Sequence, residues 1–183
     1  MRSVLQSAVR PAVAGTLLCA LAGCGGDSVR PPVVVVTPVP VRGIIAQTSF
    51  SGFDSGVWVG IDIGLSQRGK VDITVDWTFT DTWMYVYFGA QSCGYPELAG
   101  GKCAYLLSSE TKDPKPRVLY TDNLDAGTYH LYLYNVPHDP RTHTGSDNTE
   151  TVSLQVGLTV GAEGRAPGTV RLGRPTVLVP PRL

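Results

Sequence analysis

Four cysteines are the residues of this chain whose type and spacing most directly indicate chemistry. Cys19 and Cys24 lie near the N-terminus, whereas Cys93 and Cys103 bracket a loop that is rich in glycine and proline. An even pair in an exported chain predicts a disulfide. The alternative is a metal or redox pair, but such pairs favour the two-residue gap of Cys-x-x-Cys, and this gap is wider. Closing so short a loop would stabilise the fold by about 2.5–3 kcal/mol through chain entropy.

The N-terminal segment 1–23 has the layout of a signal peptide, which predicts export. A basic start with Arg2 and Arg10 is followed by an apolar run over 12–22 that ends in small residues. The run is too short for a membrane-spanning helix, which needs about 20 apolar residues. The alternatives are a plain secreted protein and a short buried helix that contains two chance cysteines.

The end of this segment, Leu21-Ala22-Gly23-Cys24, resembles the lipobox of bacterial lipoproteins at all four positions. The resemblance implies that the signal peptidase accepts the small Ala22 and Gly23, that the Cys24 sulfur carries diacylglycerol as a thioether, and that cleavage makes Cys24 the N-terminus. Cys19 follows two leucines and lacks the small residue before the cut. More than one acyl chain would anchor the protein stably, which makes the membrane a partner through the lipid on Cys24. Gly25 stands where an Asp is associated with inner-membrane retention, so we expect a cell-envelope location, at the outer membrane rather than the inner one.

The other candidate constellations do not make a catalytic or metal site. Ser92 lies in Gly89-Ala-Gln-Ser-Cys-Gly94, where the first glycine is one residue too far away for a Gly-x-Ser-x-Gly elbow. Asp72 and Asp76 share a strand face, but their Cα atoms would be about 13 Å apart, wider than a glycosidase pair. The polar loop 137–150 holds two of the three histidines but lacks zinc and calcium motifs, so a bound cation is its alternative to a solvated hairpin loop. We therefore predict no catalytic residue, no metal, no cofactor and no enzymatic activity.

The charge balance argues against a nucleic-acid partner. The chain holds 15 basic and 15 acidic residues, whereas a nucleic-acid-binding domain carries a basic patch. The charge is unevenly spread, however, because the stretch after Glu163 contains arginines and no acid. Either this tail docks on the more acidic remainder of the chain, or it contacts another envelope component.

Aromatic side chains form the one candidate ligand surface. Trp83, Tyr85, Tyr132 and Tyr134 could make a flat platform for sugar rings if their strands are neighbours. Aromatic residues are also ordinary strand formers and core fillers. Solvent exposure decides between these two interpretations, because adjacent exposed rings would favour a glycan partner and burial would remove that case.

The elements that must position these residues are predicted to be strands. Within 70–80, apolar and polar residues alternate strictly, which is typical of a strand with one face on a core and one in water. The apolar members of this strand are Val71, Ile73, Val75, Trp77 and Phe79. Other strands are expected over 57–63, 83–88, 103–107, 117–121, 129–135, 152–160 and, as an edge strand, 176–179. No segment has convincing helical periodicity, so the fold class is all-β, a single antiparallel β-sandwich.

Composition divides the chain into four parts. The signal peptide, 1–23, is followed by a Pro/Val-rich linker over 24–42, whose prolines favour an extended tether. The β-sandwich domain follows over 43–163, and a basic tail with several prolines and glycines, expected to be flexible, covers 164–183. Val33–Val36 could instead pair as an edge strand.

The stretch Asn123-Leu-Asp-Ala-Gly-Thr-Tyr-His-Leu-Tyr-Leu-Tyr-Asn135, followed after a loop by Glu150-Thr-Val-Ser-Leu-Gln-Val156, resembles the end of a bacterial pre-peptidase C-terminal (PPC-like) domain. The resemblance spans about 45–160 and implies a jelly-roll-like sandwich. Members of this family are usually non-catalytic appendages of secreted enzymes that aid targeting, maturation or surface binding. We therefore expect a non-catalytic, lipid-anchored envelope protein with a binding or assembly role and an envelope protein or glycan as partner. The alternative is a carbohydrate-binding module that uses surface aromatics.

Overall fold

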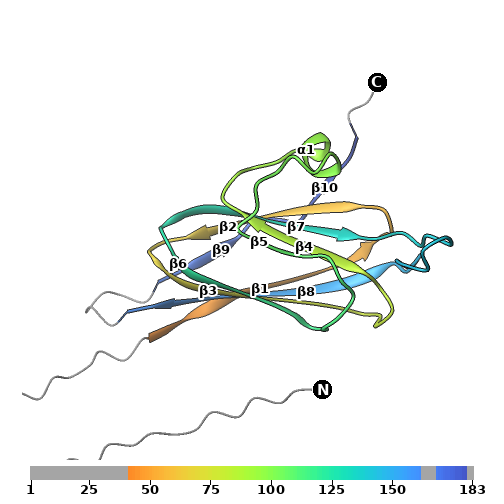
Figure 1. Ribbon diagram of the computed structural model, residues 1–183. Coiled ribbons are helices and arrows are strands. Elements are labelled where there is room, and N and C mark those ends of the chain that lie inside the picture. The colour runs from red at the N-terminus through yellow and green to blue at the C-terminus, as the bar shows by residue number, and fades with distance from the viewer. Residues whose placement is uncertain (1–40, 162–167, 181–183) are drawn as a thin grey trace, which may run out of the picture. The chain divides into compact units, whose positions relative to one another are not determined.

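The chain forms two antiparallel sheets in the computed structural model, which describes residues 41–161 and 168–180 (Figure 1). The predictions for the signal peptide, for Cys24 and for most of the linker lie outside these residues. The described elements are β1 (Val41–Phe53), β2 (Trp58–Leu65), β3 (Gly69–Trp77), β4 (Met84–Gly89), α1 (Tyr95–Ala99), β5 (Leu107–Ser109), β6 (Arg117–Leu124), β7 (Gly127–Asn135), β8 (Glu150–Val160), β9 (Val170–Leu172) and β10 (Thr176–Leu178). None of the described helices is long and apolar enough to cross a membrane.

The strand order is that of a jelly roll. Sheet A has the order β1-β8-β3-β6, and sheet B has the order β10-β2-β7-β4-β5, with β9 also paired to β2. The first strand thus pairs with the eighth, the second with the seventh, the third with the sixth and the fourth with the fifth. In this arrangement one long antiparallel hairpin is wrapped so that its successive strand pairs lie alternately in sheet A and sheet B. The predicted all-β sandwich is confirmed.

The core lies between the two sheets and is filled by the inward side chains of both. Along β3, Val71, Ile73 and Val75 are fully buried, as the alternation predicts. Burying one such side chain contributes about 1.5–3 kcal/mol, so the pattern alone strongly selects which face turns inward. The other large core residues include Ile61, Ile63, Met84, Phe88, Leu131, Leu133, Leu154 and Leu158.

The inward pattern of β3 ends earlier than the sequence predicts. β3 stops at Trp77, and the Phe79 side chain is 45% exposed rather than part of the core. The cause is the buried carboxylate of Glu150, which accepts hydrogen bonds from the backbone N–H groups of Thr78 and Phe79. These two groups are therefore removed from the strand ladder, and the chain turns away.

Three elements were not predicted. β1 forms an edge of sheet A beside β8, but register shifts between Gly43 and Ala46 and between Phe50 and Phe53 break its two-residue alternation. α1 is a five-residue helix within the predicted glycine- and proline-rich loop. β9, with β10, pairs with opposite ends of β2, so the described part of the tail extends sheet B beyond the predicted boundary at residue 163.

Candidate functional site

The outer face of sheet B carries a cluster of aromatic rings from neighbouring strands. The register places Trp58, Tyr134 and Tyr85 side by side on β2, β7 and β4. The Trp58 and Tyr134 ring centroids are 4.6 Å apart, and those of Tyr85 and Tyr134 are 6.2 Å apart. Tyr132 and Tyr87 form the next row of the same face. The predicted neighbourhood of Tyr85, Tyr132 and Tyr134 is therefore present in the structure.

The disulfide loop covers part of this cluster. Cys93 and Cys103 are joined as predicted, with their Cα atoms 6.2 Å apart. Leu98 of α1, which lies inside this loop, packs into the aromatic cluster and is only 4% exposed. The Tyr132 hydroxyl accepts a hydrogen bond of 2.6 Å from the Cys93 backbone N–H. In Figure 1 the loop with α1 lies over the side of sheet B that faces away from sheet A.

The disulfide loop affects which of the predicted platform residues are exposed to solvent. Tyr132 is 3% exposed, so its prediction as a ring available to a sugar is wrong, because the disulfide loop lies on it. Tyr85 and Tyr134 are half-buried. Trp83 is also half-buried and precedes β4, where its carbonyl accepts a hydrogen bond from the Val136 N–H. Trp58 was missed, although its outward position next to the inward residues of β2 was a signal for it.

Three tyrosines of the aromatic cluster and its surroundings have raised pKa values. Burial, followed by a hydrogen bond with Glu110, raises the pKa of Tyr87 far above its ordinary value. Burial likewise raises the pKa of Tyr105 and of Tyr134. A phenol with a raised pKa holds its proton at physiological pH and is a poor general base. The chemistry of this cluster is therefore packing and hydrogen bonding.

A small polar pocket lies at the rim of the same face, beside the tail. It has a volume of about 190 Å³, and Asp62, Ser92, His130 and Arg174 are among its lining residues. His130 Nδ1 lies 2.8 Å from Asp62 Oδ1, the arrangement of a base held by an acid. A serine nucleophile must also be hydrogen-bonded to its base. Among residues 41–161 and 168–180, no hydrogen bond joins Ser92 to His130.

The outer face of sheet A holds a groove of about 530 Å³. Two cross-strand rows form its floor. In the first, Gln47 of β1, Gln155 of β8 and Thr74 of β3 are neighbours. In the second, Ser49, Ser153 and Asp76 are neighbours on the same three strands. We call this hollow the sheet A groove; its lining residues are Gln47, Thr48, Ser49, Thr74, Asp76, Pro116, Ser153, Leu154 and Gln155.

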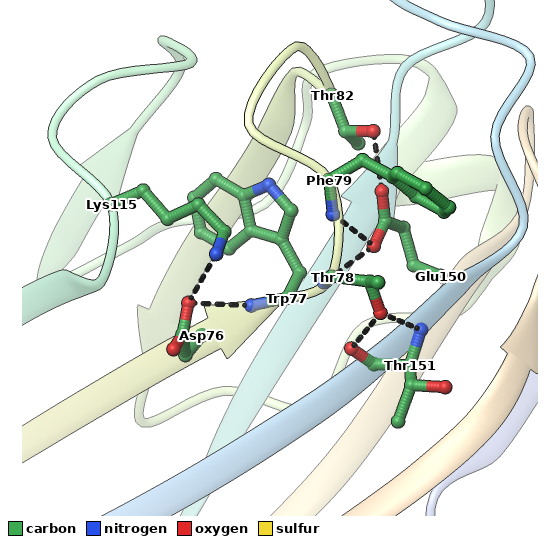
Figure 2. A network of polar contacts seen from close by, with 8 residues as sticks. All are labelled: Asp76, Trp77, Thr78, Phe79, Thr82, Lys115, Glu150 and Thr151. Carbon is green, nitrogen blue, oxygen red and sulfur yellow. Dashed lines mark hydrogen bonds and ion pairs between the residues drawn. The ribbon is translucent and has the colours of Figure 1, made fainter.

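One carboxylate of the groove is held in place by its neighbours. Asp76 Oδ1 lies 2.9 Å from Lys115 Nζ and accepts a hydrogen bond of 2.9 Å from the Trp77 N–H (Figure 2). Lys115 Nζ also lies 5.9 Å from the centroid of the Trp77 ring. Because the ammonium compensates the carboxylate, this end of the groove carries no uncompensated charge from Asp76. The sequence indicated only a solvated face at Asp72 and Asp76.

A buried glutamate fixes the end of β3 against the start of β8, next to the groove. Glu150 is 1% exposed, and its carboxylate accepts hydrogen bonds from the N–H groups of Thr78 (2.7 Å) and Phe79 (3.2 Å). The Thr82 hydroxyl donates to its other oxygen (Figure 2). Thr78 is also tied to Thr151, whose N–H donates to the Thr78 hydroxyl over 3.1 Å. These hydrogen bonds, which we call the Glu150 network, therefore set the position of the residues that continue the groove.

The long loop between β7 and β8 contains the two histidines for which a bound cation was the alternative to a solvated loop. His138 and His143 lie in it, and the His143 backbone N–H donates to the Asp139 carbonyl. Within the described parts of the chain, no group of three or more histidine, cysteine, aspartate or glutamate side chains is placed to hold a metal ion.

No protein-family model matches the chain, and no match is found among curated proteins.

Proposed function

We propose that this chain is a non-catalytic, lipid-anchored binding protein of the bacterial cell envelope. The lipobox-like Leu21-Ala22-Gly23-Cys24 supports the anchor, and Gly25 favours the outer membrane over the inner one. The Cys93–Cys103 disulfide supports an exported location, because such bonds persist in oxidising compartments. The jelly-roll strand order supports the resemblance to PPC-like domains, whose usual role is also non-catalytic.

The observation that carries the binding role is the unequal covering of the two sheets. The outer face of sheet B is covered in part by the disulfide loop, and the described tail extends its edge. The outer face of sheet A contains a groove of about 530 Å³, and no described residue outside its own strands and the neighbouring Pro116 lines it. A hollow of this size lies within the usual range of ligand sites, about 300–1,000 Å³.

Lipidation of Cys24 tests the anchor directly. The Cys24→Ala variant should incorporate no labelled palmitate and should leave the membrane fraction during a carbonate wash. The matched control is Cys19→Ala, which removes the neighbouring cysteine but keeps the lipobox and should remain lipidated and membrane-bound. Membrane retention of Cys24→Ala after the wash, or native protein that still carries residues 1–23 and no fatty acid, would refute the anchor.

A further inference from the structure

We propose that the sheet A groove binds a neutral polysaccharide chain. This inference rests on the binding role proposed above and adds the ligand class and the face that holds it. It places the site on the opposite sheet from the aromatic platform that the sequence suggests.

The lining of the groove matches the hydrogen-bonding pattern of sugars. Sugar hydroxyls both donate and accept hydrogen bonds, as do amides and hydroxyls, and the groove offers both groups. Gln47 Nε2 donates to Gln155 Oε1 over 2.9 Å, which fixes the direction of both amides. The Gln47 oxygen and the Gln155 NH₂ group therefore stay available as an acceptor and a donor at the centre of the groove.

The charge of the groove selects a neutral ligand. No lysine or arginine is among the residues that line it, and the one described cation next to it, Lys115, is already paired with Asp76, so a phosphate-rich or sulfate-rich polymer finds no unpaired cation there. Its one carboxylate, Asp76, already pairs with Lys115 and can accept from sugar hydroxyls with its other oxygen. A protein partner is disfavoured because protein hot spots rely on aromatic and arginine anchors that fill apolar pockets, and most of the lining residues carry a hydroxyl, amide or carboxylate group.

An exposed aromatic ring stands on the same face, one row beyond the groove. Tyr120 of β6 is 68% exposed and lies opposite Asp72, whereas the preceding row pairs Val118 with Thr74 of the groove. Rows on one face of a strand are about 7 Å apart, so the backbone of Tyr120 lies one row beyond the groove and one strand to its side. The negative face of an aromatic ring attracts the C–H groups of a pyranose. Gly157, on the other side of Asp72, places no side chain beside this row.

The hollow surface is long enough for an oligosaccharide rather than for a single sugar. The three strands that line it, β1, β8 and β3, span about 10 Å across sheet A, since neighbouring strands lie about 4.8 Å apart. A second hollow of about 200 Å³ shares Asp76 and Ser153 with the groove and continues past Thr78 and Thr151. Both of these threonines are held by hydrogen bonds of the Glu150 network (Figure 2), so this end of the surface is preorganised.

The test is a binding measurement with the mature lipidated protein in detergent micelles. An array of neutral gluco-, manno-, galacto-, xylo- and N-acetylglucosamine oligosaccharides identifies the best probe, and titration calorimetry with that probe measures its Kd. We expect Tyr120→Ala and Gln155→Ala to raise the Kd at least tenfold and Ser153→Arg, which fills the groove, to abolish binding. Tyr120→Phe, which keeps the ring, should bind within about twofold of the native protein.

The matched control is Leu106→Ala, which removes an exposed apolar side chain on the sheet B side and should leave the Kd unchanged. Thermal midpoints should show that all variants remain folded, since the altered sheet A side chains lie at the surface and Trp83 is only half-buried. The proposal is overturned if no neutral oligosaccharide of the array binds. It is also overturned if Trp83→Ala abolishes binding while Tyr120→Ala does not, because the site then lies on sheet B.

A third outcome would identify a protein partner instead. If a purified envelope protein binds, no oligosaccharide does and Ser153→Arg blocks the contact, the groove is a protein interface and the polysaccharide inference fails. None of these outcomes bears on palmitate incorporation at Cys24, which is measured separately. Failure of the groove and failure of the anchored-protein proposal can therefore be told apart.

Discussion

Replacement of Glu150 should be among the most damaging single changes to this fold. The side chain is 1% exposed, and its carboxylate accepts hydrogen bonds from Thr78 N–H, Phe79 N–H and the Thr82 hydroxyl. These contacts join residues about seventy positions apart in the sequence and close one end of the sandwich. Glu150→Ala removes both acceptor oxygens, and with them all three hydrogen bonds, and leaves a cavity.

The size of the stability loss depends on whether each hydrogen-bond donor finds another partner after the Glu150→Ala substitution. A hydrogen bond to a charged group contributes about 1.5–3 kcal/mol net, but three such bonds in one cluster are not additive. The N–H groups of Thr78 and Phe79 are only part-buried and can turn to water, which lowers the cost. Thr82 is fully buried, but its hydroxyl keeps the Ser146 hydroxyl as a partner at 2.9 Å. We therefore expect Glu150→Ala to lower the free energy of unfolding by about 3–5 kcal/mol.

Glu150→Gln should cost less, about 1–2 kcal/mol, because its remaining oxygen can still accept from the two backbone N–H groups. Its NH₂ group must then face Thr82, whose hydroxyl can rotate to accept from it and donate to Ser146. The free energy of unfolding should therefore be lowest for the alanine variant, intermediate for the glutamine variant and highest for the native protein. The matched control is Glu97→Gln, the same change at an exposed glutamate, which should stay within about 0.5 kcal/mol.

Urea unfolding of the non-lipidated Cys24→Ala protein, followed by tryptophan fluorescence, measures these differences. Trp77 is 2% exposed and directly precedes Thr78, so its emission reports on this end of the sandwich. With a urea slope of about 2 kcal/mol per molar, a loss of 4 kcal/mol moves the midpoint down by about 2 M. A loss of unfolding free energy below about 1 kcal/mol for Glu150→Ala would refute the proposed role of the Glu150 network. A glutamine variant that is destabilised as much as the alanine variant would refute it too.

Two further predictions concern the covered face of sheet B. The double variant Cys93→Ser/Cys103→Ser should lose about 2.5–3 kcal/mol of stability in urea and should make Tyr132 more accessible to chemical iodination; unchanged iodination would mean that the loop stays in place without its bond. The raised pKa values of Tyr87, Tyr105 and Tyr134 mean that the folded state keeps protons that the unfolded state releases above about pH 10. Their contribution to stability is therefore complete below that pH and is lost as the pH rises further, so the urea midpoint should be level from pH 8 to 9 and fall above about pH 10. A midpoint that is unchanged up to about pH 11 would contradict the burial of these phenols.

The sequence by itself determined the strands in which hydrophobic burial acts on every second residue. In β3, β7 and β8 the apolar residues repeat at period two without interruption, and each of these strands lies close to where it was predicted. The Cys93–Cys103 bond could also be predicted, because these two cysteines remain as a pair once Cys19 and Cys24 are assigned to the predicted signal peptide and lipobox. β1 could not, because its bulges shift the alternation, and β9 could not, because a three-residue strand carries too little pattern.

Only the tertiary structure decided which outward residues are covered and which are open. Tyr132 and Tyr120 are both tyrosines at outward strand positions, yet one is 3% exposed beneath the disulfide loop and the other is 68% exposed on sheet A. The alternation of apolar and polar residues predicts that a side chain points away from the core, but it does not predict which other segment of the chain covers that side chain. In the same way, the rolled hairpin brings Gln47, Gln155 and Thr74 into one row from three distant segments, because strand order depends on packing between sheets rather than on neighbours in sequence.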